Sequence, residues 1–337
     1  MTTSTIATVI PLYNKEPYIA RAIASVLAQT RPVDEIIIVD DASTDGSLER
    51  IKAFQDSRIR VLRRTDPMQR GLPATRNLGI RSATSRWIAL LDADDRWHED
   101  FIEESNKLMA QAFDRIGFLF TGWESVSPNG VVTRDAYSVR CEDLGFRRLD
   151  LDSFVSAWLD LDACPVFPSG VVIRRDMLLD AGLFQEHCRR GEDKDMWLRV
   201  LAITDALSSP RVCSSYYRDI PGAMNETIST NVRHCLCATL EEMISQASGA
   251  RRHLLMRLFN HQVIEYARWV AGRERLSPDV YRGFFVSINP RGYLLLLALS
   301  FVPVRLLKIV RQGMLWARDV IGRPRSSRDS GYSGPAS

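Results

Sequence analysis

Short apolar runs alternate with amphipathic segments through the first third of the chain. The runs at residues 6–12, 35–39, 59–62, 87–91 and 116–123 are short and carry few charges, which predicts buried strands. Between them, residues 18–27, 47–54, 73–83 and 99–112 have apolar positions at helical spacing. Strands that alternate with helices predict βαβ units, and so an α/β fold with a Rossmann-like, mostly parallel central sheet flanked by helices.

The alternation breaks down after Gly122. Pro128-Asn-Gly130 predicts a hairpin turn, and residues 135–160 show no clear period. Residues 169–174 are strand-like again, whereas residues 194–203 and the chain beyond about residue 228 have helical patterns. We therefore expect an α/β domain over residues 1–225, a helical C-terminal extension over 226–323, and a disordered tail over 324–337 that is rich in Ser, Gly, Arg and Pro.

Composition indicates a soluble globular protein with a sizeable core, because the 337 residues are 45% hydrophobic and 25% charged. The net charge of +3 is uneven: residues 300–337 carry seven Lys or Arg against two Asp, which leaves −2 for the rest. A protein that binds nucleic acid usually carries a larger basic excess on its folded face, so no nucleic-acid partner is expected.

The basic C-terminal stretch suggests contact with a membrane surface. Residues 293–304 form an uncharged run that is too short to span a bilayer as a helix. Basic residues then alternate with apolar ones, at Arg305, Lys308, Arg311 and Arg318. An apolar face beside a basic face over residues 293–320 predicts a segment that lies on anionic lipid, with a core or oligomer-contact helix as the alternative.

The six cysteines form no C-x-x-C pair and no spacing typical of a zinc site. The N-terminus lacks the basic region of a secretory signal. We expect reduced cysteines and a cytoplasmic location, peripheral on the inner face of the cell membrane.

Acidic residues crowd the end of the predicted strand at 87–91. Asp92 and Asp94 are two positions apart, so their side chains are expected on the same side of an extended chain. Two convergent carboxylates repel each other unless a cation lies between them. A hard divalent ion suits them, with phosphate oxygens and water as its other ligands. The alternative is a solvated acidic turn in which Asp95 caps a helix.

Two other segments carry polar groups toward the same edge of the sheet. The strand at 35–39 ends in Asp40 and Asp41, which either accept hydrogen bonds from a base or ribose or take part in helix capping. The segment at 71–79 opens a helix whose N-terminus and Arg76 suit a phosphate, unless Arg76 is an ordinary surface charge. Because open α/β sheets bind ligands at the carboxyl ends of their strands, a nucleotide, a diphosphate and a metal are expected together there.

Four motifs occur in the order and spacing of family 2 glycosyltransferases: VIPLYN at 9–14, IVDDASTDG at 38–46, ATRNLG at 74–79 and LDADD at 91–95. Residues 169–175, 181–184 and 191–199 are similar to the family's acceptor side. The resemblance covers about residues 5–220 and implies a GT-A fold, an inverting mechanism, a nucleotide-diphosphate sugar donor and a divalent metal, Mg²⁺ or Mn²⁺. It implies a nucleotide-sugar half over 1–115 and an acceptor half over 116–225.

The resemblance also implies roles for residues at the donor site. Pro11 and Tyr13 would line the base pocket, and Asp41 would contact the base or ribose. Arg76 would lie near the diphosphate. The two remaining donor-site positions would serve the metal: Asp94 as a ligand, and Asp92 as a contact to the metal or the ribose.

On the acceptor side, Asp193 would be the general base that takes the proton of the acceptor hydroxyl. Its neighbour Glu192 could raise its pKa by like-charge repulsion, unless the two acids only favour the start of a helix. The secondary candidates are Asn14, Asp40, Asp95 and Glu192. His98 and His187 have no partner at metal-ligand spacing and are not expected to bind metal.

We expect transfer of a single sugar, with a UDP-sugar favoured as donor, to a glycan or lipid-linked acceptor in surface polysaccharide or other glycoconjugate biosynthesis. Polymerising family members carry a Gln-x-x-Arg-Trp motif, whereas here Gln262 lies six residues before Arg268. A catalytically silent nucleotide-sugar-binding scaffold of a membrane polysaccharide assembly is one alternative. A sugar nucleotidyltransferase is another, although it would need a Gly-rich loop after the first strand.

Overall fold

The structure is a computed structural model, which describes residues 5–64, 71–112, 115–188, 190–218, 233–270 and 273–302. The chain forms two compact units, one reaching His261 and the other including the chain from Gln262 onward. The expected boundary at residue 225 falls within residues 219–232, outside the described residues, and stays a prediction.

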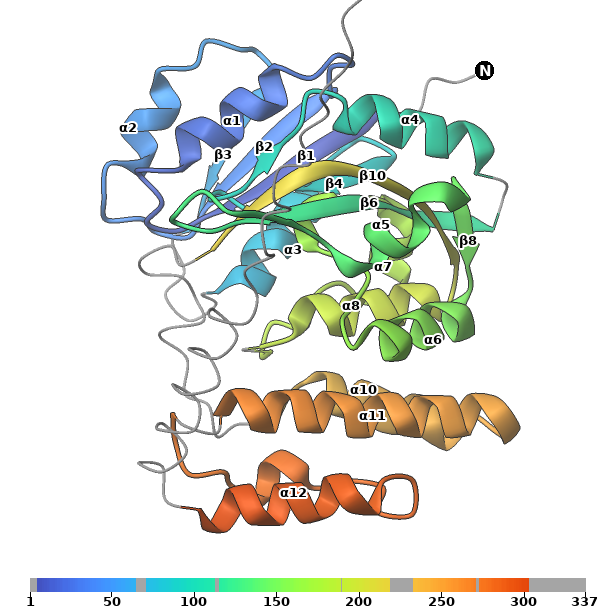
Figure 1. Cartoon of the computed structure of the whole chain (residues 1–337). Coiled ribbons are helices and arrows are strands. Elements are labelled where there is room, and N and C mark those ends of the chain that lie inside the picture. The colour runs from blue at the N-terminus through green and yellow to red at the C-terminus, as the bar shows by residue number, and fades with distance from the viewer. Residues whose placement is uncertain are drawn as a thin grey trace, which may run out of the picture. The chain divides into compact units, whose positions relative to one another are not determined.

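A single mixed sheet organises the first unit (Figure 1). In the described residues it has ten strands, in the order β3-β2-β1-β4-β9-β6-β10-β5, with β7 on β6 and β8 on β10. The strands are β1 (Ile6–Leu12), β2 (Glu35–Asp40), β3 (Ile59–Arg63), β4 (Trp87–Leu90), β5 (Arg96–Trp97), β6 (Ile116–Val126), β7 (Val132–Arg134), β8 (Arg147–Leu149), β9 (Val171–Arg174) and β10 (Asp205–Tyr217).

The expected α/β fold with a central sheet flanked by helices is confirmed, and the sheet is parallel over β1 to β4 and mixed beyond them. β1 is parallel to β2 and β4, and β2 is parallel to β3. β9 then runs antiparallel to both β4 and β6, because the chain reaches it at the carboxyl edge and returns through the sheet. β10 restores a parallel pairing with β6.

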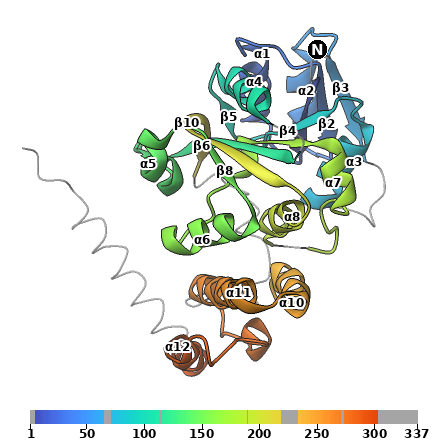
Figure 2. The same cartoon turned by 90° about the vertical axis from the view of Figure 1, so that its right-hand side faces the viewer.

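Helices cover both faces of this sheet (Figure 2). α1 (Ile19–Leu27), α2 (Ser47–Lys52) and α4 (Phe101–Gln111) contribute to one apolar core that includes Ile10 and Ile38. α3 (Leu72–Ser82), α7 (Arg175–Asp180) and α8 (Glu192–Leu201) lie on the other face. Gly79 allows α3 to approach β1 closely, since a Cβ there would lie 2.4 Å from a methyl group of Val9.

Residues 135–160, which show no clear period in the sequence, contain α5 (Ala136–Cys141), β8 and α6 (Leu151–Leu161). The long strand β10 was also not predicted, because its sequence is rich in serine and lacks an apolar run. Its buried serines form hydrogen bonds within the protein. The Ser208 hydroxyl forms a hydrogen bond with the Tyr137 hydroxyl at 2.8 Å, and the Ser209 hydroxyl donates to Glu104 at 2.6 Å. Tertiary pairing therefore outweighs the local pattern here.

Helices dominate the described chain beyond residue 233. α10 (Leu236–Gln246) belongs to the first unit, α11 (Gly249–Val270) crosses the boundary between the units, and α12 (Pro290–Phe301) belongs to the second. None of the described helices is both long and apolar enough to span a bilayer. The predicted membrane-surface segment at 293–320 is described only to residue 302, and the tail at 324–337 lies outside the described residues.

A disulfide joins Cys188, just before α8, to Cys235, just before α10. The expectation that all six cysteines are reduced is therefore wrong. The two residues are 47 positions apart, and the fold brings their Cα atoms to 5.6 Å, which spacing along the sequence could not reveal. Consequently the cysteine pattern no longer supports a cytoplasmic location.

Candidate active site

The loop after β4 carries three carboxylates at the carboxyl edge of the sheet. Asp95 is 1% exposed and accepts a hydrogen bond from the Ser169 hydroxyl at 2.6 Å, while that hydroxyl accepts the backbone N–H of Asp92 at 3.1 Å. Burial raises the pKa of Asp95 well above its usual value, and the charges of Asp92 and Asp94 raise it further. The three acids thus lie close enough to influence one another, as the clustered motif predicts.

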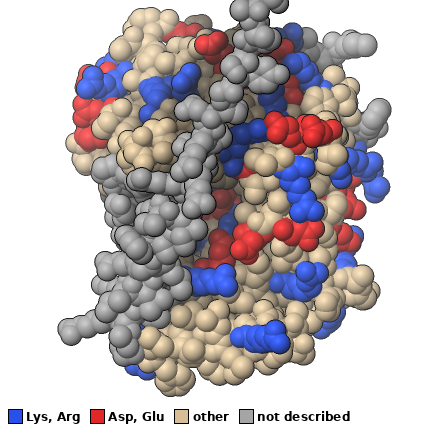
Figure 3. Space-filling model, viewed as in Figure 1, with Lys and Arg blue, Asp and Glu red and all other residues tan. Residues whose placement is uncertain are grey.

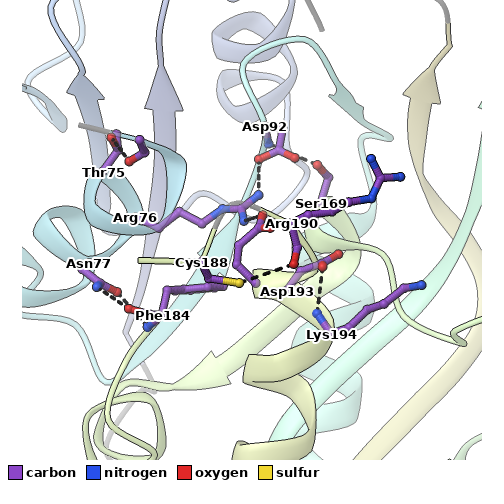
Figure 4. A network of polar contacts seen from close by, with 12 residues as sticks. Thr75, Arg76, Asn77, Asp92, Ser169, Phe184, Cys188, Arg190, Asp193 and Lys194 are labelled. Carbon is purple, nitrogen blue, oxygen red and sulfur yellow. Dashed lines mark hydrogen bonds and ion pairs between the residues drawn. The ribbon is translucent and has the colours of Figure 1, made fainter. Parts of the chain in front are cut away.

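Arg76, in the second turn of α3, is not the surface charge of the alternative interpretation, since it is 1% exposed. Its guanidinium contacts Asp92 at 2.7 Å and Glu192 at 3.2 Å (Figure 4). Burial alone would lower its pKa, but the charges of Asp92 and Glu192 outweigh burial and raise it. Arg76 therefore joins α3, the loop after β4 and the start of α8. Its contact with a diphosphate stays a prediction.

The two acids at the start of α8 differ in environment. Glu192 is 8% exposed, and burial followed by the charge of Asp193 raises its pKa to about 7, although Arg76 opposes the shift. Asp193 is half-buried and accepts the backbone N–H of Lys194 at 2.8 Å. In Figure 4 Asp193 lies below Arg76, next to Lys194, and Asp92 lies above Arg76. Both acids also suit the N-terminal dipole of α8.

The acids after β2 help to shape the loop that opens α3. Asp41 accepts the backbone N–H of Gly71 at 2.8 Å, where Gly71 has φ 123°, a conformation that favours glycine. The other carboxylate oxygen of Asp41, Oδ1, is buried and has no hydrogen-bond partner among the described residues, although Arg64 lies 3.6 Å from it. A base or ribose donor would satisfy this oxygen. Asp40 is buried and accepts the backbone N–H of Ser43 at 3.1 Å.

The three candidates near the end of β1 have different exposures. Pro11 is buried and pairs with Val39 of β2. It lies beyond the last residue pair between β1 and β4, so the N–H that proline lacks removes no hydrogen bond between these two strands. Tyr13 is 52% exposed, which leaves its ring available to stack on a base. Asn14 has φ 49° and accepts the backbone N–H of Thr44 at 2.8 Å.

Lys15 and Ser169 have site contacts that the sequence reasoning did not anticipate. The Lys15 ammonium lies 2.7 Å from the Asp94 carboxylate. Ser169 joins the start of the segment 169–175 to the acidic loop through its two hydrogen bonds. Their positions beside recognised motifs, directly after VIPLYN and at the start of the segment 169–175, were the only signals in the sequence.

An aromatic cluster lies close to Ser169. The Phe167 ring is 5.0 Å from the Trp123 ring and 5.1 Å from the Tyr216 ring, measured between centroids. Trp123 and Tyr216 come from the ends of β6 and β10, and Phe167 precedes Ser169 by two residues. Ligand sites are commonly lined by such aromatic groups.

The residues of the acidic loop fit a divalent cation in part. No group of three or more His, Cys, Asp or Glu side chains in the described chain could enclose a metal ion by itself. Within the part of the chain that the structure describes, Asp92 and Asp94 each make one ion pair through a single oxygen. Each therefore keeps an oxygen for a cation whose other ligands are phosphate and water. His98 contacts Ser215 at 2.9 Å and Glu124 at 3.4 Å.

The described face in Figure 3 has acidic and basic side chains intermixed, without a continuous surface of one charge. The central sheet flanked by helices has the GT-A fold of glycosyltransferases. Solved structures share this fold: Staphylococcus aureus TarS 1-349 in complex with UDP-GlcNAc has a TM-score of 0.63 at 15% identity, with 92% of each chain covered. The mannosyltransferase PcManGT from Pyrobaculum calidifontis, in complex with GDP-Man and Mn²⁺, has a TM-score of 0.53 at 18% identity and covers 95% of this chain and 88% of its own.

Sequence comparisons define the family. The profile of Glycosyl transferase family 2 matches residues 8–148, and that of Glycosyl transferase family group 2 matches residues 87–315. The chain belongs to the family 2 glycosyltransferases, which confirms the resemblance.

Individual relatives cover this chain to different extents. The UDP-Glc:alpha-D-GlcNAc-diphosphoundecaprenol beta-1,3-glucosyltransferase WfgD of Escherichia coli is 28% identical over 213 residues, which are 63% of this chain and 76% of WfgD. A glycosyltransferase of Rickettsia felis is 31% identical over 196 residues, which are 58% of this chain but only 30% of that protein.

Proposed function

We propose that this protein transfers a single sugar from a UDP-sugar to a hydroxyl of a lipid-linked glycan, with inversion at the anomeric carbon. The main support is the position of Arg76, whose contacts with Asp92 and Glu192 tie the acidic loop of the donor half to the start of α8 in the acceptor half. The E. coli relative, named as a glucosyltransferase that uses UDP-Glc and a diphosphoundecaprenol-linked acceptor, supports the choice of donor and acceptor. The TarS complexes with UDP-GlcNAc and UDP support a UDP-sugar as well.

In the proposed reaction the acceptor oxygen attacks the anomeric carbon as the bond from that carbon to the diphosphate oxygen breaks. Asp193 takes the proton of the acceptor hydroxyl, and UDP leaves with the bonding electron pair. Asp92 and Asp94 would hold a divalent cation, which when bound stabilises the negative charge of the departing diphosphate. Asp41 and Tyr13 would hold the base and ribose, with Pro11 beside them.

A binding screen and a transfer assay test this proposal. We expect UDP with Mn²⁺ to raise the melting temperature more than GDP, dTDP or CDP with Mn²⁺, because selective binding stabilises the folded state. Asp193→Asn should keep this stabilisation by UDP and lose sugar transfer to a diphosphoundecaprenol-linked acceptor. Normal transfer by Asp193→Asn would exclude Asp193 as the base.

The same assay separates the enzyme from a catalytically silent scaffold. The scaffold alternative has one observation in its favour, since Arg76 and Lys15 already neutralise Asp92 and Asp94 without a metal. An enzyme hydrolyses or transfers its donor with Mg²⁺ or Mn²⁺ and stops when EDTA is added. A scaffold binds UDP-sugar and is silent on every donor under both conditions.

We also propose that the C-terminal segment contacts an anionic membrane surface. Leu294 and Phe301 of α12 are 65% and 77% exposed, and the sequence that follows carries Arg305 and Lys308. Buried apolar area and attraction to anionic lipid together determine such binding. The protein should co-sediment with phosphatidylglycerol vesicles and much less with phosphatidylcholine vesicles. A Leu294→Ser/Phe301→Ser variant that sediments like the unaltered protein would refute the role of this surface.

A further inference from the structure

The strongest unassigned contact in the site is the ion pair between Lys15 and Asp94. The Lys15 ammonium lies 2.7 Å from Oδ2 of Asp94, and the two side chains are only 15% and 20% exposed. A partly buried pair at this distance is screened by water much less than a surface pair. The carboxylate with the assigned role of metal ligand is therefore already paired with a cation of the chain itself.

The structure holds both partners of this pair in place. The backbone N–H of Lys15 donates to the Ser47 hydroxyl at 2.9 Å, and its carbonyl accepts the N–H of Tyr18 at 2.9 Å and of Ile19 at 3.0 Å. On the other side, Arg21 donates to the backbone carbonyl of Asp94. The Lys15 side chain that contacts Asp94 is thus attached to a backbone that hydrogen bonds hold in a fixed turn.

Charge pairing gives this contact a consequence for metal binding. Arg76 pairs with Asp92 as Lys15 pairs with Asp94, so the two assigned metal ligands carry little uncompensated charge. A divalent cation that arrives alone must displace the Lys15 ammonium or share Asp94 with it, and the repulsion between the two cations weakens binding. The single negative charge of Asp94 cannot neutralise both the Lys15 ammonium and the divalent cation.

A diphosphate removes this conflict. Lysine is a compact point charge on a flexible four-carbon stem, and it binds phosphate well. The ammonium can therefore turn from Asp94 to a phosphate oxygen while its backbone stays fixed. Asp94 is then released to the cation, which itself gains phosphate ligands.

We propose that Lys15 couples the binding of the divalent cation to the binding of the nucleotide diphosphate. It occupies Asp94 in the empty site and transfers to the diphosphate when cation and nucleotide arrive together. This inference rests on the proposed function, because it takes the nucleotide diphosphate and the cation as ligands of this site. The coupling is reciprocal, so that UDP raises the affinity for the cation by the same factor as the cation raises the affinity for UDP.

The test measures Mn²⁺ binding directly, by the electron paramagnetic resonance signal of free Mn²⁺, with and without UDP. For the unaltered protein we expect weak binding of Mn²⁺ alone and an affinity that rises about 10–100-fold with saturating UDP. In Lys15→Met, Mn²⁺ alone should bind about tenfold more tightly, and UDP should raise that affinity only a few-fold. Lys15→Gln gives a second variant if Lys15→Met does not fold, as judged by circular dichroism.

Lys52→Met is the matched control, because Lys52 pairs with Glu49 on the surface, where their side chains are 70% and 73% exposed. This control should behave as the unaltered protein does. If Lys15→Met binds Mn²⁺ with unchanged affinity and unchanged dependence on UDP, the coupling role is wrong while the proposed function stands. If the unaltered protein binds no UDP in the presence of Mn²⁺, the proposed function fails and this inference fails with it.

Discussion

Replacing Arg76 with methionine should destabilise the protein strongly and in a pH-dependent way. Arg76→Met keeps most of the side-chain volume but removes the charge that compensates Asp92 and Glu192 at 2.7 and 3.2 Å. Breaking a buried ion pair by removing one partner costs about 3–5 kcal/mol. A domain has a total stability of about 5–15 kcal/mol, so this loss is a large part of it.

The pH dependence follows from Glu192. Its pKa is already raised to about 7 by burial and by Asp193, and the loss of Arg76 would raise it further. Between pH 7 and 8 the folded variant therefore retains a proton that the unaltered protein has released. Each pH unit over which this difference persists adds about 1.4 kcal/mol to the destabilisation. The variant should be closest to the unaltered protein near pH 6 and furthest from it near pH 8.

Urea unfolding followed by circular dichroism at pH 6 and pH 8 measures both effects. Arg251→Met is the matched control, because Arg251 pairs with Asp152 where their side chains are 52% and 39% exposed, and surface pairs contribute little. A loss below about 1 kcal/mol at both pH values would refute the idea that Arg76 compensates these acids. An equal loss of stability at the two pH values would instead show that the pKa of Glu192 does not depend on Arg76.

Three further outcomes test other parts of the site. Asp94→Asn, or EDTA added to the unaltered protein, should abolish the rise in melting temperature that UDP causes with Mn²⁺; an unchanged rise would remove Asp94 from the metal site. The pKa of Glu192 is about 7 in the folded protein, against an ordinary value of 4.5. Glu192 therefore adds on the order of 3 kcal/mol to the free energy of unfolding below pH 4.5, and this contribution is lost as the pH rises to about 7. Glu192→Gln should thus reduce the difference in urea stability between pH 5 and pH 8, and an unaltered difference would contradict the shift. Trp123→Ala should raise the KM for the acceptor severalfold, up to about tenfold, and leave donor hydrolysis unchanged if the aromatic cluster contacts the acceptor; a change in donor hydrolysis alone would assign the ring to the donor.

The sequence was most informative where chemistry and periodicity coincide. Asp92 follows a short apolar run, and such runs end at the carboxyl edge of a parallel sheet, so its place beside Arg76 and near Asp95 could be anticipated. The parallel strands β1 to β4 were predicted for the same reason. Local patterns suffice for such features because each depends on residues close together in the chain.

Features that depend on distant pairing could not be predicted. Lys15 directly follows one motif and Asp94 lies in another, far along the chain, and only the fold shows that the two charges meet. The disulfide from Cys188 to Cys235 depends on the approach of the segments before α8 and α10. β10 owes its strand conformation to its pairing with β6 and β8 rather than to an apolar pattern. In each case the decisive energy comes from a partner far along the chain.

The remaining choice at the start of α8 is which acid takes the proton of the acceptor. A pKa near 7 would by itself suit Glu192 for that role, since a base works best when its pKa lies near the working pH. However, Glu192 is 8% exposed and engaged by Arg76 at 3.2 Å, whereas Asp193 is half-buried and its recorded hydrogen bond comes from the backbone of Lys194. A base must reach the acceptor hydroxyl, so we assign the proton to Asp193. Glu192→Gln should then retain transfer, because the base that receives the proton is still present. Loss of transfer in Glu192→Gln, with transfer kept in Asp193→Asn, would reverse the assignment.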